Sequence, residues 1–454
     1  MKKETFLELM GEIDAELIEK VQNKNRASYK KFIISAIAAC LAICIAITAI
    51  MGGAPQINNA PVSVLCSAGY PDTVNRAPFL SDAEKHGGIK KFYAATLARM
   101  LSENKGENAV YAPANIYVAL AMLAEMTDGE SRAQILSLLG ADDINSLRIN
   151  ARAIWNLCYS NGESKSVIAN SLWLDNKYND ILKKEPLENI REYYYASSFS
   201  GNFASEKYVW EMRNWINSQT NGFLNDSVKN WSPGDDTVLA LISTLYFKDG
   251  WENVFSEGET KDMTFYTTDG EAVRCPYLCA DKAEIEGYWG DNFIAITKKL
   301  KNGGSMLFIL PDRGYTPEEL LCDEDFIKFM SAPTEWSNKD RLTRDIRIPK
   351  FDVCSGGDIS DDLKELGITD IFDANRADFS PLSDVPLFVS EINHSIRIKI
   401  DEQGIEAASY SIIQAPCGGQ VPSLVKFDRP FLFAVTSESG IPLFAGVIND
   451  PIEN

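Results

Sequence analysis

The sequence has little histidine and no surplus of positive charge. It contains 2 histidines in 454 residues, and its formal net charge is −20. A surface that binds nucleic acid needs clustered Lys and Arg, so this charge argues against a nucleic-acid partner. Enzyme classes that use histidine as an acid, a base or a metal ligand are also disfavoured.

Cysteine and catalytic motifs are sparse as well. The 9 cysteines are an odd number spread over a long chain, without the density of a disulfide scaffold. Cys275 and Cys279 form the one close pair outside the apolar N-terminal run, and too few further ligands accompany them for zinc. The chain has no GxSxG elbow, HExxH pair or phosphate loop. We therefore expect no enzyme activity, no metal and no cofactor.

One long run carries no charge. Residues 32–51, FIISAIAACLAICIAITAIM, are about long enough to cross a bilayer as a helix, and a loose linker follows them. The basic residues cluster on the N-terminal side of this run, which places the N-terminus in the cytoplasm; they are Lys24, Arg26, Lys30 and Lys31. We predict a cytoplasmic segment over residues 1–31, a transmembrane anchor over 32–51, a linker over 52–80 and an extracellular domain over 81–454. Cleavage of the anchor would give a secreted form.

The rest of the chain mixes two periodicities. GGIKKFYAATLARML repeats its apolar residues at helical spacing, whereas TVLALISTLYF, GSMLFILP and DIRIPKFDV have strand character. No regular βαβ alternation and no internal repeat is present. This pattern predicts one large α+β domain.

A stretch near the C-terminus has the pattern of a strand buried on one side and also that of an exposed loop. In an extended conformation Ile405, Ala407 and Ser409 share one uncharged face, while Glu406 and Tyr410 lie on the other. Such a strand could be buried on one side. The same stretch continues into Pro416, a Gly pair and Pro422, which favour an exposed loop.

Long motifs in order give residues 82–454 a specific resemblance to the serpin family. They include NAVYAPANIYVALAMLAEMTDGESRAQIL, LALISTLYFKDGWENVF, LKELGITDIFDANRADFSPLS, LFVSEINHSIRIKIDEQGIEAAS and RPFLFAVTSESGIPLFAGVINDP. The resemblance implies an α+β serpin fold with three β-sheets, about eight to nine helices and an exposed reactive-centre loop, here preceded by one transmembrane helix. It also implies a monomer.

The resemblance assigns the loop to residues 404–421. A target protease would attack it, and the loop would then insert into the main sheet with the acyl-enzyme attached. The implied hinge consists of Gly404, Ile405, Glu406, Ala407, Ala408 and Ser409. Cys417, Gly418 and Gly419 are the candidates for the reactive bond. No Lys or Arg lies between Gly404 and Val425, which disfavours a trypsin-like target and favours elastase-like or subtilisin-like enzymes that prefer small residues.

Two further sites carry over by resemblance. Glu402, Lys350 and Trp251 match the breach, where insertion begins, and the alternative for the charged pair is a solvated surface contact. His394, Asn115 and Ser243 match the shutter under the middle of the sheet. Asn115 and Ser243 exchange the family's usual serine and asparagine, and either arrangement could satisfy a buried imidazole. Ala112 stands where a serine is usual.

Two functions follow from these residues. The first is a membrane-anchored, extracytoplasmic inhibitor of serine or cysteine proteases, suited to a bacterial surface. The alternative is a serpin without inhibitory activity that serves as a binding or structural protein. Ile405 and Tyr410 favour the alternative, since the family usually has a threonine and a small residue there.

Overall fold

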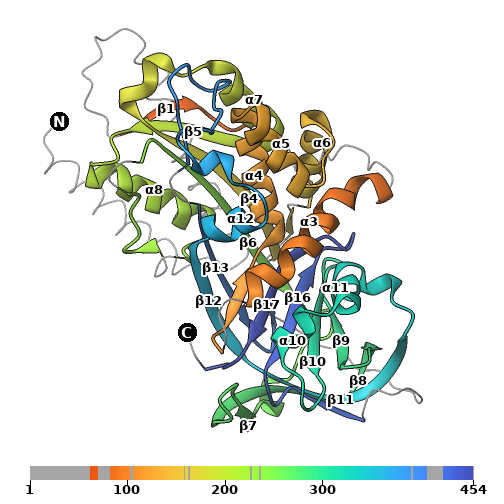
Figure 1. Ribbon diagram of the computed structural model, residues 1–454. Coiled ribbons are helices and arrows are strands. Elements are labelled where there is room, and N and C mark those ends of the chain that lie inside the picture. Colours follow the sequence, from red (N-terminus) through yellow and green to blue (C-terminus); the bar gives the residue numbers. More distant parts are fainter. Residues whose placement is uncertain are drawn as a thin grey trace, which may run out of the picture. The chain divides into compact units, whose positions relative to one another are not determined.

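The computed structural model describes residues 62–69, 82–102, 106–157, 159–161, 164–224, 228–234, 237–389, 392–405 and 423–452. Within these residues the strands form three sheets, and helices pack around them (Figure 1). The three sheets agree with the fold expected from the sequence. The predicted anchor and most of the reactive-centre loop lie outside the described residues.

The first sheet places its strands in the order β1-β5-β4-β6-β14. β5 (Ala196–Gly201) runs parallel to β4 (Ser164–Asp175), and β6 (Leu239–Gly250) runs antiparallel to β4. The two-residue strand β14 (Gly404–Ile405) pairs with the end of β6, and β3 (Tyr159–Asn161) pairs with β4. β6 is therefore the last long strand of this sheet.

The edge strand β1 was not expected. Residues Ser63–Cys66 lie in the region predicted to be a linker, yet they pair antiparallel with β5. The amide of Ala68 also donates to Ser197 Oγ at 3.0 Å. The stretch is only four residues long and carries no extended alternation, so its sequence did not distinguish it from a loop. Part of the predicted linker thus belongs to the folded domain.

A separate two-stranded sheet continues beyond β6. β12 (Phe351–Asp358) and β13 (Asn393–Ile400) pair antiparallel in regular register, from Phe351 opposite Ile400 to Asp358 opposite Asn393. β13 leads directly into the turn that precedes β14. The chain therefore leaves the β12-β13 sheet at the end of β13 and returns along β6, at the edge of the first sheet. We call these two sheets together the divided sheet.

The largest sheet forms the second layer of the domain. Its order is β15-β11-β8-β9-β10-β16-β17-β2, with β7 on β8. The bounds are β2 Ala109–Tyr111, β7 Lys261–Tyr266, β8 Ala272–Trp289, β9 Phe293–Lys299, β10 Ser305–Pro311, β11 Lys339–Pro349, β15 Leu424–Lys426, β16 Phe431–Thr436 and β17 Pro442–Ile448. All seven residues of β17 are buried, as expected for a central strand covered on both faces.

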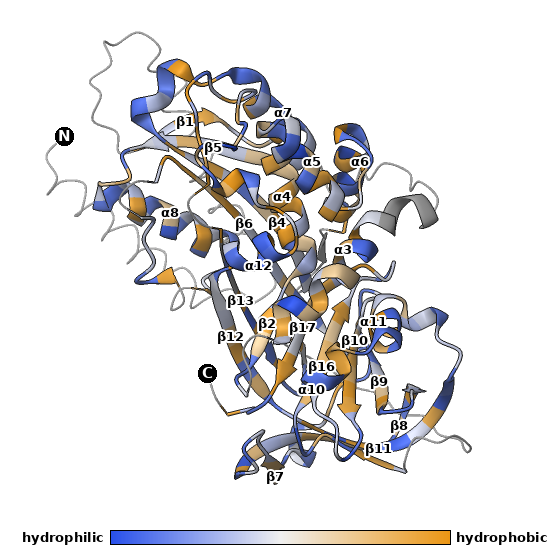
Figure 2. Cartoon of the chain, in the orientation of Figure 1, coloured by the Kyte–Doolittle hydropathy of each residue, from blue (hydrophilic) through white to orange (hydrophobic). Residues whose placement is uncertain are grey.

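Helix α4 (Pro113–Met126) explains how the layers share one core. Proline opens the helix, where its missing N–H costs nothing, and most of the later residues are apolar and buried. α4 packs against both β6 and β17, and Figure 2 shows the apolar residues along α4, β16 and β17. The other α-helices are α3 Asp82–Ser102, α5 Gly129–Leu138, α6 Ile144–Trp155, α7 Lys184–Tyr194, α8 Glu206–Gln219, α10 Pro317–Leu321, α11 Glu324–Ser331 and α12 Ser360–Glu365.

The membrane prediction has no support in this part of the molecule. None of the helices in the described ranges combines the length and the apolar character that crossing a bilayer requires. Residues 32–51 were the predicted span, and they are not among the described residues.

Candidate functional site

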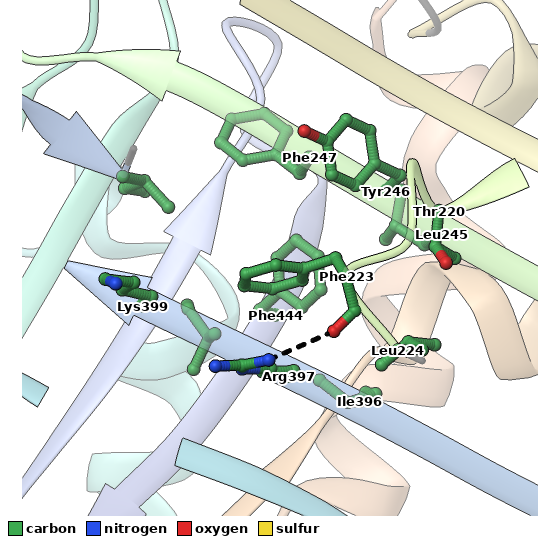
Figure 3. A pocket seen from close by; sticks show the side chains of 12 residues that line it. Thr220, Phe223, Leu224, Leu245, Tyr246, Phe247, Ile396, Arg397, Lys399 and Phe444 are labelled. Carbon is green, nitrogen blue, oxygen red and sulfur yellow. Dashed lines mark hydrogen bonds between the residues drawn. The ribbon is translucent and has the colours of Figure 1, made fainter. Parts of the chain in front are cut away.

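The two halves of the divided sheet face each other across a narrow gap, which we call the slot. Residues 245–247 of β6 lie on one side, residues 396–399 of β13 lie on the other, and Ile405 is part of the lining. Figure 3 shows Phe223 over this gap, where its carbonyl accepts a hydrogen bond of 3.3 Å from Arg397 Nη1. The Arg397 guanidinium also lies 4.8 Å from the centre of the Phe223 ring. The segment that follows α8 thus lies over the slot, and the Arg397 side chain of β13 holds it there.

The hinge begins with a tight turn into the slot. Asp401 N donates to Gly404 O at 3.0 Å, and Gln403 N donates to the Asp401 carboxylate at 2.9 Å. Gly404 then pairs with Gly250, and Ile405 pairs with Asp249. A Cβ at Gly404 would lie 2.4 Å from the carbonyl oxygen of Asp249, so only glycine fits. Ile405 is 3% exposed, and the chain therefore starts down the slot with an apolar side chain inside it.

The breach residues predicted from the sequence lie together. Lys350 Nζ bonds both oxygens of the Glu402 carboxylate, at 3.0 and 2.7 Å. Thr260 Oγ1 donates to the same carboxylate at 2.6 Å. Burial raises the pKa of Glu402, but the bonds from Lys350 and Thr260 outweigh burial and hold that pKa below its ordinary value. Glu402 is 8% exposed, so the pair is more than a solvated surface contact.

Trp251 fixes the backbone of the same turn. Its indole Nε1 donates to Asp401 O at 2.9 Å, and its backbone N–H donates to Gln403 O at 3.1 Å. Phe255 N donates to Glu402 O at 2.9 Å. The indole is fully buried and lies against the rings of Phe255 and Phe308. The turn is therefore held through its backbone as well as through the Glu402 side chain.

The shutter residues line one small cavity of about 50 Å³. Asn115 Nδ2 donates to Ser243 Oγ at 2.7 Å, and Ser243 Oγ donates to Asn170 Oδ1 at 2.7 Å. Asn170 in turn donates to the carbonyl of Tyr194 at 2.9 Å. Asn115 and Ser243 thus hydrogen-bond to each other, and Ser243 also bonds to Asn170. This chain of bonds connects α4, β6, β4 and α7.

His394 has a different partner from the one expected. Its Nε2 accepts a hydrogen bond of 3.2 Å from the backbone N–H of Ala112, the residue that precedes α4. Burial lowers the pKa of His394 from 6.5 to about 4, so the imidazole is neutral at physiological pH. A neutral ring has an acceptor nitrogen for the Ala112 amide, whereas the charged ring has none. The imidazole therefore ties β13 to the start of α4.

Sequence reasoning missed Asp249 at the first rung of the slot. This buried carboxylate accepts hydrogen bonds from Ser164 Oγ at 2.9 Å and from Asn302 Nδ2 at 2.8 Å. It also accepts from the backbone amides of Gly250 and Asn302, at 2.9 and 3.2 Å. A single acidic residue within FKDGW gave no signal, because all its partners except Gly250 are distant in sequence. Asp249 joins three segments where β14 pairs with β6.

Of the predicted reactive-centre loop, the structure describes only Gly404 and Ile405. Glu406, Ala407, Ala408 and Ser409 of the predicted hinge, and the bond candidates Cys417, Gly418 and Gly419, lie outside the described residues. After the loop, β15 pairs in parallel with β11, with Val425 opposite Ile346. Cys275 and Cys279 are buried free thiols in β8. The chain before the undescribed residues 406–422 thus lies in the slot, and the chain after them lies in the large sheet.

The structure thus shows a divided sheet whose slot receives the chain at Gly404 and Ile405. Comparison with known proteins identifies the family that shares this arrangement. The profile described as Serpin (serine protease inhibitor) matches residues 89–451. Serpin-Z1C from Triticum aestivum is 29% identical over 388 residues, which cover 79% of this chain and 95% of that protein. Alpha-1-antiproteinase S from Cavia porcellus is 29% identical over 376 residues, covering 79% and 89%.

A solved structure agrees with these relatives. The crystal structure of tengpin, a thermophilic serpin in the native state, matches with a TM-score of 0.72 and 26% identity, covering 86% of this chain and all of tengpin. The chain belongs to the serpin family. Serpins as a family are serine protease inhibitors and do not act as enzymes in the catalytic sense.

Proposed function

We propose that this serpin inhibits serine proteases, and cysteine proteases as a second class, by covalent trapping followed by insertion of its loop into the slot. The observation that carries the proposal is the hinge: Gly404 turns the chain into the slot, and Ile405 lies buried in it. An apolar β-branched residue suits a strand buried on both sides. The unusual hinge residue is therefore compatible with insertion, which weakens the case for a serpin without inhibitory activity.

The proposed targets are elastase-like or subtilisin-like proteases. Cleavage is assigned to Cys417-Gly418 or Gly418-Gly419, because these small residues suit a small specificity pocket and no basic residue is nearby. The proposed setting is the outer face of a membrane, with residues 32–51 as the anchor and the N-terminus in the cytoplasm. A bacterial surface would suit this arrangement. Both the specificity and the setting rest on sequence alone.

The test uses the soluble domain and a panel of proteases. Incubation with an elastase-like protease should give an SDS-stable complex, and the peptide released from the C-terminal side should begin at Gly418 or Gly419 by mass spectrometry. Trypsin should not be trapped rapidly. A serpin without inhibitory activity would be cleaved, or left intact, by every protease in the panel without forming a complex.

A matched pair of substitutions tests the insertion step. Ala407→Glu puts a charge on the face that must enter the sheet, and burying it unpaired costs several kcal/mol, so we expect cleavage without a complex. Ala408→Glu makes the same chemical change on the opposite face and should preserve most trapping. Equal trapping by both variants would contradict the assignment of faces.

A further inference from the structure

A second concave site lies outside the slot, on the large sheet. It is a cleft of about 640 Å³ between the ends of β8, β9 and β11 and the segment after Trp251. Polar and charged side chains dominate its lining, which comprises Glu252, Asn253, Glu284, Ile285, Glu286, Thr297, Lys298, Lys299, Thr334, Arg341, Leu342 and Thr343. Acidic and basic groups are balanced here, with three of each. The cleft therefore has no net charge that would attract an ion of one sign.

Lys298 is the unusual member of this lining. On β9 it stands opposite Met306 of β10, so its side chain starts on the face that carries the core residues. It is only 7% exposed. Its Nζ lies 4.6 Å from the centre of the Phe255 ring, and no carboxylate among the described residues forms an ion pair with it. A buried ammonium group without a hydrogen-bonded partner is rare and costly.

We propose that the cleft is a site where the Lys298 amine captures small neutral aldehydes as a reversible imine. The amine nitrogen adds to the carbonyl carbon, the carbonyl oxygen takes up a proton, and loss of water gives the C=N bond. No oxidant or reductant is required. The product can be uncharged, so imine formation removes a poorly compensated charge from a buried position.

The chemistry of the cleft favours a neutral electrophile over an anion. The basic and acidic side chains of the lining balance, so the cleft offers an anion no net attraction, whereas a small neutral aldehyde needs none. Burial lowers the pKa of Lys298 from 10.5 to about 8, and the nearby Glu252 carboxylate only partly opposes this. Near neutral pH the fraction of free amine is then on the order of 100-fold larger than for an ordinary lysine. Lysines that act through Schiff bases are activated by desolvation in the same way.

The experiment uses acetaldehyde as the probe. The full domain is treated with a limiting amount of acetaldehyde and cyanoborohydride near neutral pH, which converts the imine to N-ethyl-lysine, and the labelled lysines are identified by mass spectrometry. Lys299 is the internal control, because it is the next residue of β9 and is exposed. We expect Lys298 to be labelled about 10-fold faster than Lys299, because the gain in free amine is partly offset by lower nucleophilicity.

Two further measurements make the result decisive. The rate of labelling at Lys298 should level off above about pH 8, while the rate at Lys299 continues to rise toward the pKa of an ordinary lysine. Phe255→Leu removes the ring that faces the ammonium and should increase labelling at Lys298. Equal rates at the two lysines, or parallel pH profiles, would overturn the proposal; the wild-type comparison decides this even if a variant folds poorly. Protease trapping is measured separately, so failure here leaves the proposed inhibition untouched.

Discussion

The breach and the shutter both lie beside β13, but they hold the molecule with different chemistry. At the breach, Glu402 is charged and receives bonds from Lys350 and Thr260. At the shutter, the imidazole of His394 is neutral and accepts from a backbone amide. One site therefore requires a group to stay ionised, and the other requires a group to stay uncharged. Acid should affect the shutter first and the breach second.

The largest effect we expect is a loss of stability in acid that comes from His394. Its folded-state pKa of about 4 lies below the ordinary 6.5, so the unfolded chain binds the extra proton between these values. Stability should be unaffected above about pH 6.5 and should fall as the pH drops toward 4, by up to about 3 kcal/mol. Urea unfolding midpoints from neutral pH to pH 4.5 would measure this.

His394→Ala should remove this first acid-dependent loss. Glu402 should contribute below its ordinary value of 4.5, because its folded-state pKa is lowered and its stabilising charge is lost only on protonation. The variant should therefore retain a second, more acidic loss. If the variant keeps the full loss between pH 6.5 and 4.5, groups other than His394 are responsible, and the contrast between the two sites fails.

The next largest effect should come from Lys350→Met. It leaves the Glu402 carboxylate, which is nearly buried, with Thr260 as its one side-chain partner among the described residues. Removing one partner of a buried pair is strongly destabilising, and because Lys350 is partly exposed we expect about 2 to 3 kcal/mol. Thermal unfolding should show a lower midpoint. Protease trapping should change as well, because the turn before the hinge loses a constraint.

The matched control is Lys364→Met. Lys364 pairs with Asp361 on α12, where both side chains are exposed and one turn of helix apart. This change should alter stability by less than about 0.5 kcal/mol. Similar effects of the two substitutions would mean that the Lys350 pair behaves as a surface contact.

The smallest losses of stability that we expect come from two single substitutions at the shutter, compared at neutral pH. His394→Ala leaves the Ala112 amide without an acceptor and should cost about 1 to 2 kcal/mol. Ser243→Ala interrupts the bonds from Asn115 and to Asn170, but the neighbouring cavity of about 50 Å³ has room for a water molecule, so we expect about 1 kcal/mol. Because the two bond sets share no atom and have only the cavity in common, the double variant should show additive losses apart from a coupling of about 0.5 kcal/mol through that cavity. Strong coupling would show that they form one network.

The sequence predicted the serpin fold, whereas the roles assigned to the breach and shutter residues stay predictions. Glu402, Lys350 and Trp251 lie in long motifs of the serpin family. The structure pairs Lys350 with Glu402, and the Trp251 indole bonds the backbone carbonyl of the adjacent Asp401. Side-chain pairing at the shutter was harder to predict, because the partner of His394 is a backbone amide whose position depends on where α4 begins. Any residue except proline could supply that N–H, so Ala112 carried no signal.

Asn170 and the edge strand were missed for related reasons. Asn170 lies within an apolar strand, and its bond to Ser243 depends on the register between β4 and β6, which places the two residues opposite each other. β1 depends on a free edge of β5, which is formed by residues more than a hundred positions later. Local patterns report periodicity and turns, whereas these contacts follow from the assembled sheet.

The position of β1 fixes where the chain enters the folded domain. Ser63 pairs with Ser200, Ser200 with Leu174, and Leu174 with Leu239, so the chain enters the domain level with the start of β6. Gly404 pairs at the other end of this 12-residue strand, about 36 Å away. The point where the chain enters the domain and the start of the predicted hinge therefore lie at opposite ends of β6. A strand that continued from Ile405 along β6 would run toward the end at which β1 lies.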